Sequence, residues 1–318
     1  MAAANDDIES AGGAEALLDG LKAEIGPEGF QHLLDARHAV SHLARGRKLM
    51  VSFERIQDTL EESDEGTPLS LDFAEDKNWS ALHFTAEGNT WFRSQAVYAF
   101  IDDLIDDGFF EQFDQILFYG ANMGGYAAAA FSVAAPGARV LAIAPQATLD
   151  HARTEWEDRF PKARQLDFTR RYGYGPDMVE AAAHAHILYD PHQWQDAVHA
   201  SLFYATNITR LRCRFLGNRI ARCLREMDLL HQIVEAAGEG RLTEQTFFRL
   251  MRRRRDHDLY LRNLLFHLDD QQRPYLTALY CAHVLGRINA PVFRRRLNAS
   301  RALLAEQGAV PQWLEHTS

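Results

Sequence analysis

The stretch ILFYGANMGGY, which runs from residue 116 to residue 126, decides how this chain folds. It begins as an apolar strand, passes through a turn at residues 120–125 and enters a helix of small residues. The apolar run RVLAIA at residues 139–144 predicts a second strand directly after that helix. Two strands joined by a helix are parallel, and the connection is right-handed. The sequence therefore predicts an α/β fold.

Further strands and helices are expected on either side of this unit. The apolar runs that predict strands are residues 48–54, 80–86, 185–189 and 209–216. Residues 95–110 carry apolar side chains at helical spacing on one face, and residues 14–45 predict two helices separated by Gly26-Pro27. The expected architecture is a mostly parallel sheet with helices on both faces.

The chain is expected to divide into three parts. Residues 1–13 predict a disordered tail, and residues 14–219 predict an α/β domain that begins with helices. Between two of its strands, residues 150–183 form a cap-like excursion. The aromatic side chains of this excursion either line a ligand site or pack the cap; they are Trp156, Phe160, Tyr172 and Tyr174. Residues 220–318 have helical periodicity without strand signals, which predicts a helical C-terminal subdomain.

The turn at residues 120–125 carries the small residues that a very tight strand-to-helix connection needs. Gly120 and Gly124 stand two positions before and after Asn122, and Gly125 follows. In this context the stretch resembles the α/β-hydrolase family, in particular members whose nucleophile elbow reads G-x-S-M-G-G-Y, over roughly residues 48–218. The resemblance implies an α/β-hydrolase-like fold in which Asn122 occupies the position of the nucleophilic serine.

The same family places an acid and then a histidine after later strands. Asp190 directly follows the strand expected at residues 185–189 and fits the acid position. Asn218 follows the last expected strand, 28 residues after Asp190, where the family has its histidine. The resemblance thus implies a triad in which Asn122 and Asn218 replace the nucleophile and the base.

Two asparagines cannot perform the proton transfers of a serine hydrolase. An amide does not ionise near neutral pH, so Asn122 could not readily form an acyl-enzyme and Asn218 could not shuttle protons. The oxyanion hole implied by the family uses backbone N–H groups, here that of Met123 and one from the loop after Phe53. We therefore expect a catalytically degenerate protein that binds a small carbonyl-containing or anionic ligand, or a protein partner.

Three other interpretations stay open. His199 lies near Asp190 in the sequence and could be the base of an atypical acyl hydrolase or transferase that activates water. Arginines at residues 249, 252–255 and 294–296 could make the helical subdomain an interaction module for acidic partners. The glycine-rich turn could also belong to another doubly wound fold.

Composition restricts the function classes. The chain has 318 residues, of which 47% are hydrophobic, and its net charge of −10 opposes binding to nucleic acid or to an anionic membrane. No apolar run reaches the ~18 residues that span a bilayer, and the acidic N-terminus does not resemble a signal peptide. The expected partner is a small molecule or a protein, and neither a membrane nor nucleic acid.

Few residues suit a metal or a disulfide. Cys213, Cys223 and Cys281 include no CxxC pair, which indicates a reducing cytosol and hence a cytoplasmic protein. His184 and His186 have the spacing of one strand face, but no third-ligand motif accompanies them. The sequence therefore predicts neither a metal nor a cofactor.

Residues 136–150, PGARVLAIAPQATLD, resemble sequences that carry a phosphoadenosine phosphosulfate reductase label. The chain lacks the SGG-x-D-S phosphate loop after the first strand and the Cys-Gly-x-His motif that this activity would use. Cys281 lies in an apolar helical context, which favours an inert thiol. That activity is not expected.

Overall fold

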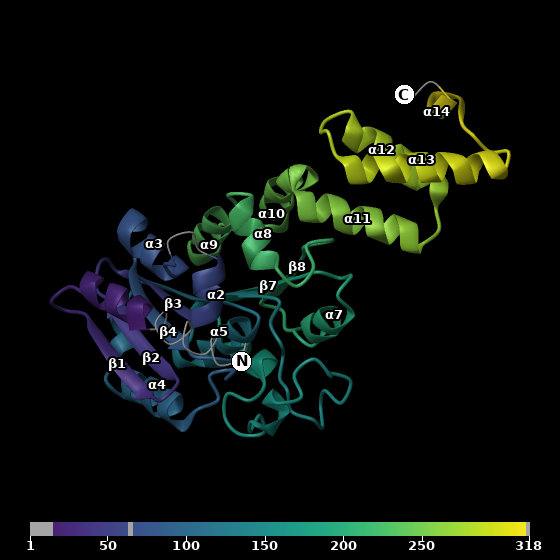
Figure 1. Cartoon of the computed structure of the whole chain (residues 1–318). Coiled ribbons are helices and arrows are strands. Elements are labelled where there is room, and N and C mark those ends of the chain that lie inside the picture. Colours follow the sequence, from purple (N-terminus) through teal and green to yellow (C-terminus); the bar gives the residue numbers. More distant parts are fainter. Residues whose placement is uncertain (1–14, 63–65, 316–318) are drawn as a thin grey trace, which may run out of the picture. The chain divides into compact units, whose positions relative to one another are not determined.

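The computed structural model describes residues 15–62 and 66–315 of the chain (Figure 1). The tail predicted at residues 1–13 lies outside the described residues. The chain divides into two compact units, the first from Met1 to Met251 and the second from Arg252 to Ser318.

The first unit is built on one sheet of eight strands in the order β1-β2-β4-β3-β5-β6-β7-β8. The strands are β1 (Phe30–Asp35), β2 (His38–Leu43), β3 (Lys48–Arg55), β4 (Ser80–Ala86), β5 (Gln115–Ala121), β6 (Arg139–Ile143), β7 (His184–Tyr189) and β8 (Ile208–Arg212). β2 is antiparallel to both of its neighbours, and all pairs from β4 to β8 are parallel. The carboxyl ends of the parallel strands therefore meet at one edge, where open α/β sheets bind their ligands.

Helices cover both faces of this sheet. They are residues 15–24, α2 (Ile56–Glu62), α3 (Leu69–Lys77), α4 (Gln95–Asp106), α5 (Met123–Phe131), α6 (Gly175–Met178), α7 (Trp194–Ser201), α8 (Ile220–Glu226), α9 (Leu230–Gly238) and α10 (Glu244–Leu250), with 3-10 turns η1 (Phe109–Gln112), η2 (Ser132–Ala134), η3 (Ala163–Gln165) and η4 (Val179–Ala181).

Alternate residues of the strands face opposite layers. Phe118 of β5 belongs to the core that α4 and α5 cover, whereas Leu117 approaches Gly238 of α9 on the other face. Figure 1 shows α3 and α9 across the sheet from α4. The predicted fold class, a mostly parallel sheet with helices on both faces, is confirmed.

The segment before β3 departs from the prediction of two helices. Residues 15–24 are helical, but β1 and β2 form an antiparallel hairpin. Asp35 closes this hairpin, because its Oδ1 accepts hydrogen bonds from the backbone N–H groups of Arg37 and His38. Every residue of β2 is buried between β1 and β4, so pairing in the sheet outweighs the helical spacing of the apolar residues.

The division between the units falls later than the helical subdomain predicted to begin at residue 220. α9 contacts β5 and β6, and α10 contacts β8. These helices cover sheet residues that would otherwise be exposed, and they therefore belong to the first unit. The helical spacing of apolar residues identifies such helices, but it does not show which hydrophobic core they pack against.

A row of polar side chains crosses the sheet on the face that α9 covers. The strand register aligns seven polar residues in this row, with the apolar Leu141 of β6 between the fifth and the sixth: Gln31, Ser41, His83, Ser52, Tyr119, His186 and Thr209. His83 is fully buried, with the hydroxyls of Ser52 and Ser70 at 2.8 and 3.3 Å from its Nδ1. Its Nε2 has no hydrogen-bond partner among the described residues. Burial lowers the pKa of His83 to about 3.

We expect the free energy of unfolding to fall steeply as the pH drops from 6.5 to 4. Burial lowers the pKa of His42 and of His186 to about 4, in addition to that of His83, against an ordinary value of 6.5. The unfolded chain binds these protons more tightly, so stability present above pH 6.5 is lost on acidification. Each buried histidine contributes up to about 1.4 kcal/mol per pH unit, which urea titrations across this range measure.

The substitution His42→Phe tests this origin. Neither ring nitrogen of His42 has a hydrogen-bond partner within the described residues, and its ring contacts those of Phe30 and Phe109. The variant should lose less stability in acid than the wild type. His32→Phe is the control, because His32 is exposed and also contacts Phe30. An unchanged pH dependence in His42→Phe would contradict the prediction.

All regular secondary structure among the described residues of the second unit is helical, as the sequence predicts for the C-terminal region. Its helices are α11 (Asp258–Asp270), α12 (Pro274–Leu285), α13 (Pro291–Glu306) and α14 (Gln312–Glu315), preceded by the 3-10 turn η5 (Met251–Asp256). Leu261, Leu265, Cys281, Phe293 and Leu297 contribute to a core of its own. Within the described parts of the chain, no helix combines the length and the apolarity that crossing a membrane requires.

Candidate functional site

Asn122 occupies the tip of a very tight turn between β5 and α5, at the carboxyl edge of the sheet. Its backbone torsions are φ 53° and ψ −118°, a region that residues other than glycine rarely adopt. The N–H of Asn122 donates a 2.8 Å hydrogen bond to the carbonyl oxygen of Ile143 on β6. The turn is therefore strained and is held in place by the neighbouring strand.

The glycines around Asn122 are required by close backbone approach. A Cβ atom on Gly120 would lie 2.2 Å from the carbonyl oxygen of Gly124, and one on Gly124 would lie 2.0 Å from the carbonyl oxygen of Phe53. A Cβ on Gly125 would lie 2.9 Å from the carbonyl oxygen of Ile143. The small residues singled out in the sequence thus let α5 start directly against β3 and β6.

We expect Asn122→Gly to raise the free energy of unfolding by about 1 kcal/mol. Glycine adopts the observed torsions without the strain of a side chain, and this gain exceeds the entropy that glycine adds to the unfolded chain. Asn122→Ala should instead lower stability, because asparagine tolerates positive φ better than alanine. Urea unfolding measures both, with Asn298→Gly in α13 as the control that should destabilise. Stabilisation by Asn122→Ala would contradict the observed torsions.

An open cavity of 390 Å³ adjoins this turn. Its walls come from the end of β3, α2, the loop before α4, the Asn122 turn, the excursion after β6, α7 and the loop after β8. The lining residues are Arg55, Asp58, Asn89, Trp91, Asn122, Met123, Gln146, Arg159, Phe160, Asp196 and Asn218.

Three residues predicted for the site line this cavity, namely Asn122, Met123 and Asn218. Met123 is the first residue of α5, and the N–H groups of a first helical turn have no acceptor within the helix. Phe53, predicted beside the oxyanion hole, is fully buried in β3 with its carbonyl against α5. Arg55, two residues later, reaches the cavity instead.

Asp190 is fully buried and does not line the cavity. Its Oδ1 accepts a 3.0 Å hydrogen bond from the N–H of His192, and its Oδ2 accepts a 2.8 Å hydrogen bond from the N–H of Gly217. Gly217 has a positive φ of 67° and directly precedes Asn218. Asp190 therefore holds the loop that brings Asn218 to the cavity.

His199 is also fully buried and does not line the cavity. Its Nδ1 accepts a 3.1 Å hydrogen bond from the N–H of Ala147, so Nε2 carries the ring proton and donates to Oε2 of Glu157 at 3.0 Å. Trp156 packs on the ring, with centroids 4.6 Å apart. Burial lowers the pKa of His199, against the opposing effect of Glu157. Both ring nitrogens are engaged, and neither is available to activate water.

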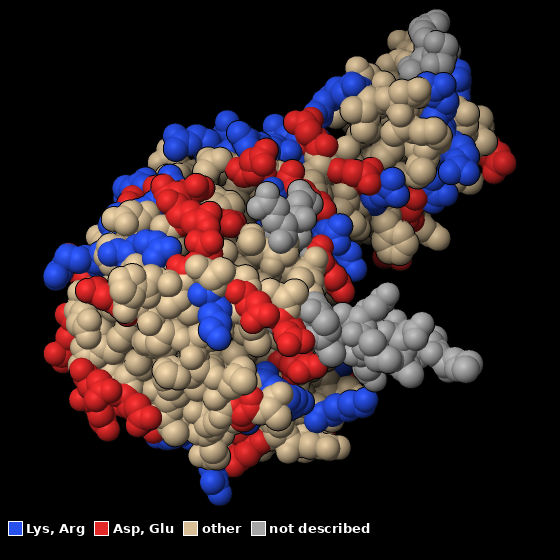
Figure 2. Space-filling model, turned by 60° about the vertical axis from the view of Figure 1, so that its left-hand side comes forward, with Lys and Arg blue, Asp and Glu red and all other residues tan. Residues whose placement is uncertain are grey.

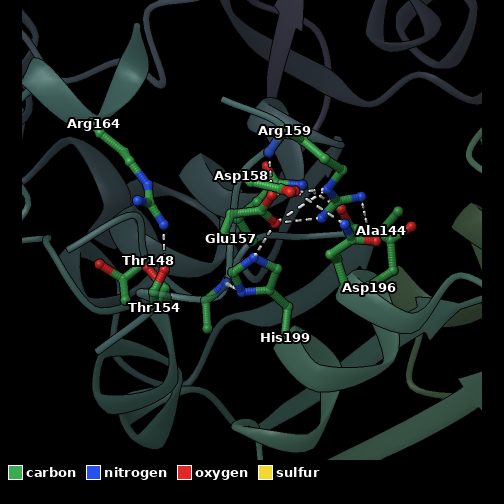
Figure 3. A network of polar contacts seen from close by, with 12 residues as sticks. Ala144, Thr148, Thr154, Glu157, Asp158, Arg159, Arg164, Asp196 and His199 are labelled. Carbon is green, nitrogen blue, oxygen red and sulfur yellow. Dashed lines mark hydrogen bonds and ion pairs between the residues drawn. The ribbon is translucent and has the colours of Figure 1, made fainter. Parts of the chain in front are cut away.

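Figure 3 shows how this histidine joins a buried ion network. Arg159 donates to Glu157 and, through Nη1, to Oδ1 of Asp196 at 2.6 Å. Burial alone would raise the pKa of Glu157, but hydrogen bonds from His199 and Arg159 lower it to about 2. Burial raises the pKa of Asp196, although Arg159 opposes this. The guanidinium group that reaches the cavity here is thus already paired with carboxylates.

A second ion pair and two aromatic rings complete the wall. Arg55 pairs with Asp58 and donates a 3.1 Å hydrogen bond to Oδ1 of Asn89. Trp91 packs edge-on against Phe160, with ring centroids 4.9 Å apart. Each of the two arginines in the wall therefore has a carboxylate partner, and aromatic rings and amide groups line the rest of the cavity with Met123.

The sequence did not identify most of these residues. Of the four aromatic residues singled out in the excursion, Phe160 lines the cavity, Trp156 packs on His199, and Tyr172 packs in the core. The fourth, Tyr174, lies beneath the guanidinium group of Arg153 and does not line the cavity. Arg55 and Trp91 follow predicted strands at one sheet edge, a signal that could have identified them. Arg159 and Asp196 carry no such signal, because their place depends on how the excursion folds.

No protein-family model and no curated protein matches the chain. Similar solved structures include an esterase of Pyrobaculum calidifontis, at 10% identity and a TM-score of 0.43, which covers 72% of this chain and 91% of that one. Brefeldin A esterase, a bacterial homologue of human hormone sensitive lipase, matches at 11% identity and a TM-score of 0.42, over 73% of this chain and 85% of that one.

A mutant of the capsule O-acetyltransferase of Neisseria meningitidis serogroup A, in complex with CoA, matches at 11% identity and a TM-score of 0.40. The match covers 66% of this chain and 99% of that one. Likenesses of this size assign no family to the chain, and its function has to follow from the residues around the cavity.

Proposed function

We propose that this protein is a catalytically degenerate α/β-hydrolase-like protein that binds a small carbonyl-containing ligand beside Asn122. The observation that carries the proposal is that Asn122, Met123 and Asn218 line one cavity while Asp190 holds the adjoining loop. In serine hydrolases the equivalent positions supply the nucleophile, an oxyanion-hole donor, the base and the acid. In this chain asparagines stand where those enzymes have the nucleophile and the base, and an asparagine side chain does not ionise near neutral pH.

The chemistry of the wall favours a neutral carbonyl over an anion. The N–H of Met123 supplies a donor from the first turn of α5, and the amides of Asn122 and Asn218 can donate or accept. The guanidinium groups of Arg55 and Arg159 are paired with carboxylates, which reduces their attraction for a free anion. An apolar part of the ligand would pack on the aromatic wall.

The alternative hydrolase that uses His199 is less well supported. Its imidazole is buried and engaged at both nitrogens, whereas a general base needs a free nitrogen within reach of water. Asp190 is equally buried and accepts two backbone hydrogen bonds. Neither group can deprotonate a water in the cavity without a rearrangement of the loops that hold it.

Titration with phenylacetamide, followed by amide-proton NMR, tests the proposal. We expect saturable shifts at the backbone N–H of Met123 and the indole N–H of Trp91, and weaker binding of the charged analogue phenylacetate. Asn218→Tyr should abolish these shifts, because Asn218 lines the cavity and the larger ring would occupy part of its volume. Asn298→Tyr, on the exposed surface of α13, is the matched control and should bind normally.

Two outcomes would overturn the proposal. One is an absence of saturable shifts at both probes. The other is turnover of 4-nitrophenyl acetate that His199→Ala abolishes, because such turnover would show that the buried histidine acts as a base.

A further inference from the structure

The second unit concentrates exposed apolar side chains. Twelve large apolar side chains are exposed among the described residues, and seven of them lie in residues 252–318: Phe266, Tyr275, Leu276, Leu279, Ile288, Val292 and Leu303. Phe266 is the most exposed of the seven, at 74%. Single exposed apolar residues are ordinary on any surface, but a concentration of them marks an interaction site.

On α12 and α13 these side chains gather on the sides that the core of the unit leaves free. Leu276 and Leu279 stand three residues apart and share one exposed side of α12. Val292 and Leu303 stand eleven residues apart, or about three turns, and share one side of α13 with the exposed Arg295. Each helix therefore presents an exposed apolar face.

Arginine alone supplies the positive charge of this unit. Residues 252–318 contain 11 arginines, no lysine and 6 carboxylates, which gives +5, whereas the whole chain carries −10. Protein interfaces are enriched in arginine and depleted in lysine. Arg273 and Arg295 are exposed and have no ion-pair partner within the described part of the chain. Figure 2 shows basic side chains on either side of an uncharged area of this unit.

We propose that the exposed apolar faces of α12 and α13 bind an acidic amphipathic helix of a partner protein. Leu276, Leu279 and Val292 would contact its apolar side chains, while Arg273 and Arg295 would pair with its carboxylates. A partner of this chemistry complements both features of the surface, its apolar faces and its positive charge. None of these residues lines the Asn122 cavity, and the proposal does not depend on the function proposed there.

Other occupants fit less well. Two copies of the unit facing each other would each bring a charge of +5 and would repel. Nucleic acid would use the arginines but leave the leucines and valine without apolar partners. Carboxylates of the unit already form ion pairs with Arg262, Arg287 and Arg296. These pairs weaken the electrostatic attraction between the unit and the phosphates of a nucleic acid. The combination of features therefore favours an acidic protein segment.

Fluorescence anisotropy with the full chain tests the proposal. The probe is a labelled synthetic helix of about five turns, with leucine on one face and glutamate on the other. A scrambled peptide of the same composition has the same charge without an apolar face. We expect the amphipathic peptide to bind at least about tenfold more tightly than the scrambled one.

The apolar contribution is tested by Leu276→Ser/Leu279→Ser. This variant should weaken binding of the amphipathic peptide at least about tenfold, because it removes the exposed apolar face of α12. Leu33→Ser/Leu60→Ser removes two exposed leucines from the first unit and is the matched control. Equal weakening by both variants would overturn the assignment to α12.

The charge contribution is tested by Arg273→Glu/Arg295→Glu. We expect at least about tenfold weaker binding and a smaller dependence on salt. Arg37→Glu/Lys162→Glu changes the net charge by the same amount on exposed residues of the first unit, and it should leave binding unchanged.

Three results would overturn the proposal. Equal affinity for the amphipathic and scrambled peptides would show that the surface binds by non-specific charge attraction alone. Tighter binding of a short DNA duplex than of the peptide would identify a nucleic-acid surface. Concentration-dependent dimers that Leu276→Ser/Leu279→Ser dissolves would show that a second copy covers the face.

Discussion

Gly124→Ala should prevent folding or lower the free energy of unfolding by at least about 4 kcal/mol. The added Cβ would lie 2.0 Å from the carbonyl oxygen of Phe53 and 3.0 Å from the carbonyl carbon. Both partners are backbone, one at the start of α5 and the other in β3, which is paired on both sides by β4 and β5. Neither can withdraw without breaking hydrogen bonds of the sheet or of the helix.

Urea unfolding followed by circular dichroism measures this effect. Gly20→Ala is the control, because a Cβ on Gly20 meets nothing within 4 Å and the residue lies in a helix. That substitution should stabilise by about 0.5 kcal/mol or more. A Gly124→Ala variant within about 1 kcal/mol of the wild type would show that α5 does not start against β3.

The central part of the fold follows from the sequence. The sequence predicts a strand at residues 80–86, which form β4 with the same bounds, and a strand at residues 139–144, of which 139–143 form β6. These segments are buried on both faces of the sheet. They are therefore nearly continuous apolar runs, which can be recognised from the sequence alone. The hairpin of β1 and β2 was missed, because short apolar runs suit either a helix or a strand until their sheet partners are known.

The site could be predicted only in part, for a related reason. Asn122, Met123 and Asn218 stand at the ends of elements that can be recognised locally, and all three line the cavity. Arg159 and Asp196 meet through an excursion and a helix that no local pattern places together. Trp91 has a positive φ of 50°, a backbone conformation that is rare for an aromatic residue and that the sequence does not indicate.

The strongest gain of function is expected from Asn122→Ser/Asn218→His. The first change places a hydroxyl at the tip of the turn, beside the N–H of Met123, and the second supplies a base at the cavity. Asp190 holds the loop that carries position 218, because its Oδ2 accepts a 2.8 Å hydrogen bond from the N–H of the preceding residue, Gly217. General-base assistance is worth about 100-fold or more in rate.

The single variants isolate the two contributions. Asn122→Ser alone has a hydroxyl without a base, and Asn218→His alone has a base without a nucleophile. Both should react with a fluorophosphonate at least about 100-fold more slowly than the double variant. Far-ultraviolet circular dichroism of each variant confirms that the fold is kept.

The most direct test of the degenerate-site account is the mass of the protein after exposure to a fluorophosphonate probe. We expect no adduct on the wild-type chain and one adduct on Asn122→Ser/Asn218→His, located at position 122 by peptide mapping. A folded double variant that stays unlabelled would contradict the account, as would an adduct on the wild-type protein at a residue of the cavity.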